Sequence, residues 1–135
     1  VMITANIRYG SPAQLDGLMK ALNERAQKKR LPEAQIQLSL TPGRPPFVAG
    51  ESGRRLVDKA LAIYKEIGFD MAVVDLVGGG TDAAYAALAG KPVIEGLGLP
   101  GFGYHSNAGE YVLIDAIPRR LYLASRMISD LAAGK

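Results

Sequence analysis

GGGTDAAYAALAGKPVIEGLGLPGFGYHSNAGE, residues 78–110, is the stretch around which this sequence is organised. It holds nine of the sixteen glycines and the only histidine, His105. Glycine at this density marks backbone that turns tightly or passes close to another group. The stretch is therefore the first candidate for a functional site.

The first half of the stretch is predicted to be a strand–loop–helix–strand segment. Apolar runs at 71–74 and 92–94 are short and bounded by glycine or proline, which is typical of strands. Between them, Thr81 or Asp82 is expected to cap a helix that ends at Gly90. A glycine-rich loop before a helix is also an anion site in principle, although a plain turn followed by a helix cap explains the pattern equally well.

The second half of the stretch has no clear periodicity. A loop as long as 96–109 is unusual in a compact domain and is commonly functional or mobile. An extended segment is expected at 112–114, followed by a last helix capped by Asp115. The apolar positions at helical spacing in that helix are Ile117, Leu121, Ala124, Ile128 and Leu131.

Upstream, residues 3–41 are predicted to form a strand–helix–strand unit. Residues 3–9 and 36–40 alternate between apolar and polar side chains, which favours half-buried strands. Between them, Ser11 can cap a helix that starts with Pro12 and runs to about residue 29. Its apolar positions are Leu15, Leu18, Met19, Leu22 and Ala26.

A proline-rich linker at 41–47 marks a predicted domain boundary, because three prolines in five positions fit neither a helix nor a central strand. A second helix is expected from about residue 51 to Gly68. Its apolar positions are Leu56, Val57, Ala60, Leu61, Tyr64 and Ile67. Strands that alternate with helices predict an α/β fold.

Composition excludes several classes of function. The chain has 135 residues, a net charge of +3 and no cysteine, so neither a disulfide framework nor a thiolate metal site is possible. The basic residues are scattered without an aromatic stripe, and no apolar run is long enough to span a membrane. We therefore expect no nucleic acid and no membrane as partner. Cellular location stays open between the cytoplasm and the periplasm or exterior.

The segments GGTDA at 79–83 and GFGYH at 101–105 resemble the C-terminal catalytic segment of the zinc carboxypeptidases related to glutamate carboxypeptidase. The likeness extends over nearly the whole chain. It implies that residues 1–47 are part of a lid, or dimerisation, domain and that 48–135 are the last part of an α/β catalytic domain. The N-terminal half of the parent enzyme, with most of the active site, is expected to lie outside this chain.

The resemblance also implies roles for single residues. His105 would be one ligand of a two-zinc centre, and Glu110 would orient its imidazole, unless Glu110 is a solvated loop residue. Arg44 would bind a substrate carboxylate, the alternative being a solvated linker arginine. Asp82 is interpreted as a helix cap rather than a catalyst, and Arg8 as an ion-pairing strand residue. No catalytic residue is expected in this chain, and the full set of implied substrate-binding residues is Arg44, Gly79, Gly80, Thr81, Gly101 and Gly103.

In that family, a metal-activated water hydrolyses the amide of a C-terminal glutamate or an acyl amino acid. The other zinc ligands and the general base lie upstream in the family, so we expect this chain to be inactive alone. Core faces left uncovered by the missing half favour association, which predicts a homo-oligomer, either a dimer or a higher assembly. The alternative is a non-catalytic module that self-associates or binds a partner chain or a small anion.

Overall fold

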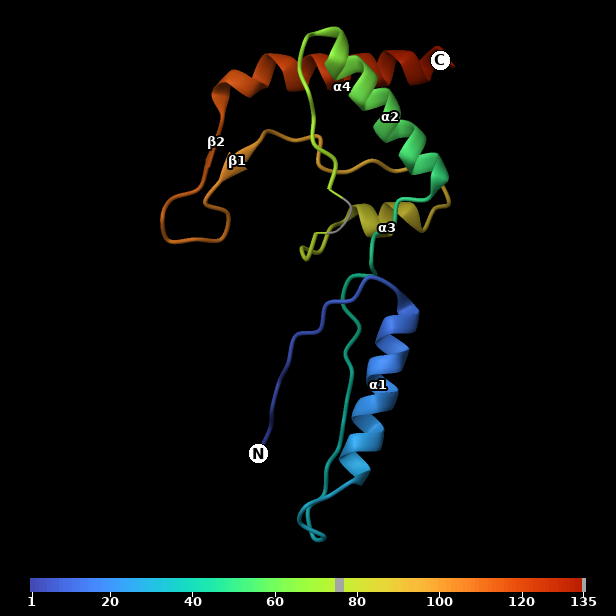
Figure 1. The fold of residues 1–135 in the computed structure, drawn as a ribbon, viewed down its shortest axis with the longest axis vertical. Coiled ribbons are helices and arrows are strands. Elements are labelled where there is room, and N and C mark those ends of the chain that lie inside the picture. Colours follow the sequence, from blue (N-terminus) through green and yellow to red (C-terminus); the bar gives the residue numbers. More distant parts are fainter. Residues whose placement is uncertain (75–76, 135) are drawn as a thin grey trace. The chain divides into compact units, whose positions relative to one another are not determined.

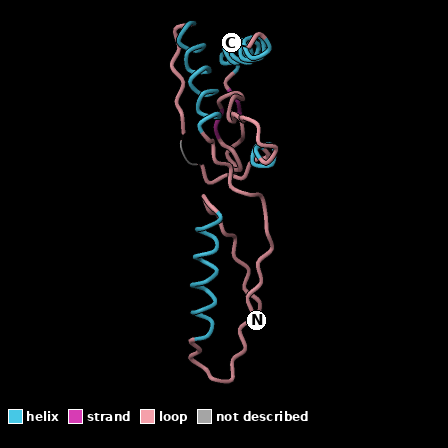
Figure 2. The backbone as a smooth tube through the Cα atoms, turned by 90° about the vertical axis from the view of Figure 1, so that its right-hand side faces the viewer, coloured by secondary structure: helices cyan, strands magenta, loops and turns pink. Residues whose placement is uncertain are grey.

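The structure is a computed structural model that describes residues 1–74 and 77–134 (Figure 1). The elements in chain order are α1 (Pro12–Gln27), α2 (Glu51–Glu66), α3 (Ala83–Ala87), β1 (Gly101–Phe102), β2 (Tyr111–Val112), the 3₁₀ turn η1 (Ile114–Ala116) and α4 (Ile117–Ala132). Helices and long loops dominate the described residues (Figure 2). Among them, no helix is both long and apolar enough to cross a membrane.

The chain divides into two compact units. The first consists of Val1–Val48 and Asp75–Gly90, and the second of Ala49–Val74 and Lys91–Lys135. The glycine-rich loop and α3 thus belong to the first unit, and the His105 loop belongs to the second. The predicted division into domains 1–47 and 48–135 stays a prediction.

The α/β prediction is confirmed only in a coarse form, as helices combined with a two-stranded antiparallel sheet. The strands predicted at 3–9, 36–40, 71–74 and 92–94 are wrong, because no described residue in those segments pairs in a sheet. Alternating side chains favour an extended backbone, but a strand also needs a neighbour that exchanges hydrogen bonds with it. These segments have no such neighbour within the described chain.

The predicted start of α1 is confirmed. The Ser11 hydroxyl accepts a hydrogen bond from the Gln14 backbone N–H at 3.3 Å, and Pro12 occupies the first turn. Extended segments before and after α1 run back along it in both views (Figures 1 and 2). No residue of α1 is buried, so its apolar face packs only partly within this unit.

The predicted end of α2 at Gly68 is confirmed, and the predicted stop at Gly90 is present as a left-handed glycine after the turn that follows α3. Gly68 and Gly90 both have a left-handed φ, of +79° and +69°, which glycine adopts without steric cost. Helix α2 ends just before Gly68, whereas α3 is shorter than expected and reaches Gly90 through a final turn.

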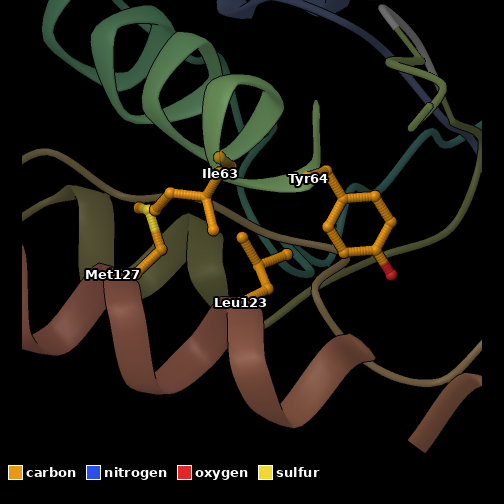
Figure 3. Close-up of a cluster of buried hydrophobic side chains, with 5 residues drawn as sticks. Ile63, Tyr64, Leu123 and Met127 are labelled. Carbon is orange, nitrogen blue, oxygen red and sulfur yellow. The ribbon is translucent and has the colours of Figure 1, made fainter. Parts of the chain in front are cut away.

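The core of the second unit lies between α2 and α4 (Figure 3). Helix α2 contributes Ala60, Ile63 and Tyr64, and α4 contributes Leu123 and Met127. Figure 3 shows Ile63, Leu123 and Met127 facing one another, with the Tyr64 ring beside them. Partly buried side chains around this core are Leu56, Ile67, Met71, Ile94 and Leu97.

The predicted apolar face of α4 is not the face that packs. Ile117, Leu121, Ile128 and Leu131 are exposed, whereas Leu123 and Met127, about 100° around the helix, are buried. The predicted Asp115 cap is also wrong, since Asp115 lies inside η1 and α4 starts without a side-chain cap. Helix α4 therefore carries two apolar stripes, and contact with α2 selects the second.

A polar network connects α2 and α4 at the edge of this core. Arg126 Nη1 donates to Glu66 Oε2 at 2.8 Å and to the Tyr122 hydroxyl oxygen at 2.8 Å, and Arg126 Nη2 lies 3.4 Å from Asp130 Oδ2. The hydrogen bond to Tyr122, followed by that to Glu66, raises the pKa of Arg126 above its ordinary value. The guanidinium therefore stays charged at every pH at which the chain folds.

Candidate functional site

The glycine-rich loop of the first unit lies against two arginines. Arg44 Nε donates to Asp82 Oδ1 at 2.9 Å, and Arg8 Nη1 donates to the Gly78 carbonyl. The Arg44 side chain also passes close to Gly80, where an added Cβ would lie 3.4 Å from Arg44 Cδ. The structure thus brings the predicted substrate-binding residues Arg44 and Gly80 together.

Arg8 is a member of this cluster that the sequence analysis missed. No ion pair of Arg8 is found among residues 1–74 and 77–134, where its guanidinium instead donates to the loop carbonyl of Gly78. The only signal in the sequence is its position in the segment 3–9, which was predicted to be a strand. Sequence reasoning identifies a charged residue there, but it cannot identify a backbone carbonyl 70 positions away as the partner.

The predicted cap function of Asp82 is wrong. Asp82 precedes α3 with φ −74° and ψ −16°, and its carboxylate makes no cap hydrogen bond. A cap residue normally has an extended backbone, which turns its side chain back over the first N–H groups of the helix. With a helical backbone the Asp82 carboxylate points elsewhere and accepts from Arg44. The Thr81 hydroxyl accepts the Ala83 N–H instead, at 3.0 Å.

The Arg44–Asp82 pair is solvent-accessible, with side chains 53% and 83% exposed. Exposed pairs of this kind contribute about 0–1 kcal/mol to stability, so the pair does not hold the loop by itself. Of the Arg44 nitrogens, only Nε takes part in a hydrogen bond described in the structure. The outer edge of the guanidinium is available to an external acceptor, and carboxylates match that edge in geometry and charge.

His105 lies on the loop that joins β1 to β2 in the second unit. The register pairs Gly101 with Val112 and Phe102 with Tyr111, whose rings lie 5.6 Å apart. The Leu113 N–H donates to the Pro100 carbonyl at 2.9 Å and extends the pairing by one further bond. The hairpin therefore fixes both ends of the loop.

The loop backbone turns sharply at His105 itself. His105 has φ +58°, a left-handed value that histidine adopts more often than most residues. Ser106 stabilises the turn, since both its N–H, at 3.1 Å, and its hydroxyl, at 2.8 Å, donate to the Gly103 carbonyl. The imidazole is exposed to solvent at this turn.

The two predicted glycines of this hairpin are required by close backbone contacts. At Gly101, an added Cβ would meet the Tyr111 carbonyl and the Tyr104 hydroxyl. At Gly103, which has φ +75°, it would meet the Gly109 carbonyl. Both glycines therefore shape the loop that carries His105.

We expect Gly103→Ala to destabilise this loop. The added methyl group meets backbone at a left-handed φ, and strain of this kind costs about 1–3 kcal/mol. Amide hydrogen exchange of Leu113, whose N–H closes the hairpin, should become at least several-fold faster. Gly98→Ala is the matched control, because an added Cβ there meets nothing within 4 Å and φ is not left-handed. Equal protection in both variants would contradict the expectation.

The predicted metal site is incomplete. No group of three or more histidine, cysteine, aspartate or glutamate side chains close enough to hold a metal is found among residues 1–74 and 77–134. His105 and Glu110 are both exposed, and no hydrogen bond joins them in the described part of the chain. Zinc requires three or four ligands, so the described residues do not fit a zinc centre by themselves.

Comparison with known proteins supports the predicted resemblance. No family model matches the chain. The chain is similar to carboxypeptidase G2 of Pseudomonas sp. (strain RS-16), with 62% identity over 133 residues. These residues make up 98% of this chain but only 32% of the relative, so the chain spans about a third of the length of that curated relative. The resemblance predicted from segments 79–83 and 101–105 is thereby confirmed.

Proposed function

We propose that this chain is the C-terminal portion of a zinc-dependent metallopeptidase that hydrolyses the amide of a C-terminal glutamate. The observation that carries the proposal is the similarity to a carboxypeptidase over nearly the whole chain. The relative is about three times as long, so the remaining parts of the enzyme would come from sequence outside these residues.

We assign residues 1–47 to a partial lid, or dimerisation, domain and 48–135 to the last part of the catalytic domain. The partial packing of α1 supports the first assignment, because a 16-residue helix with no buried residue gains little from tertiary contact. Further strands would cover its apolar side in the complete enzyme. The proposed boundary lies at the end of the proline-rich linker, between residues 47 and 48. The first segment of the first compact unit ends one residue later, at Val48.

Arg44 is proposed to bind the carboxylate of the substrate. Arg44 contacts Asp82 through Nε, so its two terminal nitrogens can form a bidentate pair with a substrate carboxylate. Gly80 has no side chain, which leaves space beside the aliphatic part of Arg44. Gly79 and Thr81 are proposed to lie on the same side of the bound substrate. Gly101 and Gly103 would act through the shape of the His105 loop.

His105 is proposed as one zinc ligand, with the other ligands supplied by the part of the enzyme outside this chain. Bound zinc would polarise the scissile carbonyl and stabilise developing negative charge. The exposed imidazole at a hairpin-held turn is suited to meet a metal that arrives with another segment. Glu110 would then accept the second N–H of the imidazole and fix its orientation.

The alternative, a non-catalytic module that self-associates, is favoured by one observation. Helix α4 exposes an apolar stripe about 100° around the helix from the residues that pack on α2. The stripe is formed by Ile117, Leu121, Ile128 and Leu131. Such a stripe is normally covered in a folded protein, either by further chain or by a second copy. A homodimer is therefore proposed for the chain alone, under either function.

The test compares the 135-residue chain with the longest protein encoded in its reading frame. Each is assayed for zinc content after dialysis, for hydrolysis of a peptide ending in glutamate, and for sedimentation. We expect zinc and hydrolysis in the longer protein alone, and no hydrolysis when the terminal residue is glutamine. A longer protein that cleaves neither peptide would contradict the peptidase proposal, and a chain that sediments as a monomer would contradict the homodimer.

A further inference from the structure

A hollow of about 280 Å³ opens on the second unit, and none of the residues assigned above lines it. It lies between the end of α2, the segment that follows it and the first turn of α4. Its principal lining residues are Tyr64, Phe69, Met71, Pro100, Arg119 and Arg120. The volume is below the usual range for pockets that hold drug-sized ligands, so a small group is the appropriate occupant.

Two residues that line this hollow each carry a buried donor atom without a partner in the described chain. These atoms are the Tyr64 hydroxyl and Arg120 Nε. Tyr64 is only 3% exposed, and Figure 3 shows its hydroxyl directed away from Ile63 and Met127. Buried donors are nearly always satisfied in folded proteins, because leaving one unpaired costs folding free energy. Two such donors on one hollow indicate that an acceptor binds there.

The two guanidinium groups are held in place by aromatic rings. Arg120 Cζ lies 5.2 Å from the centroid of the Tyr64 ring, and Arg119 Cζ lies 4.9 Å from that of Phe69. Arg120 Nη1 also donates to Met71 Sδ at 3.3 Å, which is a weak acceptor. Arg120 is therefore oriented, but its hydrogen-bonding capacity is poorly used.

The charge of the surroundings favours an anion. Arg119 and Arg120 lie in the first turn of α4, where the positive end of the helix dipole opposes cations, and that turn contains no acidic residue. Asp70 also lines the hollow, but its exposed carboxylate already accepts from Lys65 Nζ at 3.0 Å. A bound anion would offset the unfavourable interaction of the two arginines with the helix dipole, and it would also reduce the electrostatic repulsion between them.

We propose that this hollow is a carboxylate-binding site. The two oxygens of one carboxylate accept the Tyr64 O–H and the Arg120 Nε–H at the same time, as planar acceptors do with arginine. Arg119 also lines the hollow and supplies further positive charge. The site shares no residue with the Arg44 cluster of the other unit. The test of this site can therefore succeed or fail whatever the outcome for the proposed peptidase function.

The test is a titration of the full chain in which acetate replaces chloride step by step, so that the ionic strength stays constant. The nitrogen resonance of Arg120 Nε reports on the site. We expect a saturable shift that chloride alone does not cause. Tyr64→Phe should weaken acetate binding about tenfold or more, because it removes one hydrogen bond to a charged acceptor. Tyr85→Phe, at an exposed tyrosine of the first unit, should leave it unchanged.

Acetate binding should also change the tyrosine absorbance of the wild-type chain, because it adds a hydrogen bond to the Tyr64 hydroxyl. Arg120→Gln should abolish this change, whereas Arg54→Gln, at an exposed arginine of α2, should not. Circular dichroism of each variant separates loss of binding from loss of fold. A shift of Arg120 Nε that follows chloride, or acetate binding that is equal in wild type and Tyr64→Phe, would overturn the proposal.

A carboxylate could also come from an aspartate or glutamate of a second copy of the chain. In that case the Arg120 Nε resonance shifts as protein concentration rises without acetate, and acetate reverses the concentration dependence. If the free ligand is the occupant, only acetate moves the resonance. A resonance that responds to neither acetate nor protein concentration would overturn the assignment of the hollow as a carboxylate site.

Discussion

In the longer protein, His105→Asn should lower hydrolysis of a C-terminal glutamate amide by about 100-fold or more and reduce zinc content. The magnitude follows from the several kcal/mol of charge stabilisation that a catalytic metal supplies. Asparagine is preferred to alanine because His105 has φ +58°, a value that asparagine adopts at little cost. The variant therefore removes the imidazole and keeps the turn.

The control for this variant is Asn107→Ala, two residues further along the same loop. Asn107 is exposed and has no role in the proposed site, so its removal should leave zinc content and hydrolysis close to wild type. If His105→Asn retains both zinc and activity, His105 is a structural loop residue and the proposed ligand is wrong. Metal analysis after dialysis and a progress curve for each variant provide the two readouts.

The second large effect concerns stability. Leu123→Ala should lower the free energy of unfolding of the chain by about 2–5 kcal/mol, the range for leucine truncations in a packed core. Leu123 is fully buried between α2 and α4 and contacts the cluster formed with Ile63 and Met127. Urea unfolding, followed by circular dichroism, measures the change.

Leu121→Ala is the matched control, because it makes the same chemical change in the same helix. Leu121 is 64% exposed in the structure, so its truncation should change the free energy of unfolding by about 0.5 kcal/mol or less when it is measured at protein concentrations low enough to dissociate the proposed homodimer. A larger loss for Leu121→Ala than for Leu123→Ala would show that the stripe predicted from the sequence is the packed one. Concentration dependence of the Leu121 effect would indicate instead that a second copy covers the stripe.

Much of the local structure could be predicted because its causes lie within a few residues. Ser11 and Pro12 specify where α1 begins, and Gly68 and Gly90 specify where the next helices end. The likeness to a carboxypeptidase was equally accessible, since the segments at 79–83 and 101–105 carry it in contiguous sequence. Helix caps, left-handed glycines and short sequence motifs depend on neighbouring residues, so they can be predicted without knowledge of the rest of the fold.

The functional cluster around the glycine loop was only half predictable. The sequence predicts Arg44 and the loop residues as substrate-binding residues, but it favours a helix cap for Asp82. Its backbone conformation, which no local pattern specified, directs the carboxylate to Arg44 instead. The choice between a cap and an ion pair depends on whether an arginine 38 residues away comes within reach.

The sequence alone therefore determined where the helices lie, the start of α1, the end of α2 and the likeness of the chain to a carboxypeptidase. The tertiary structure alone decided which face of α4 is buried, because Leu121 and Leu123 are equally apolar and only contact with α2 distinguishes them. It also decided that the predicted strands stay unpaired, since a strand exists only with a hydrogen-bonding neighbour. Local signals fix conformation within a turn or two, whereas burial and pairing are properties of two segments and follow from which partner each one meets.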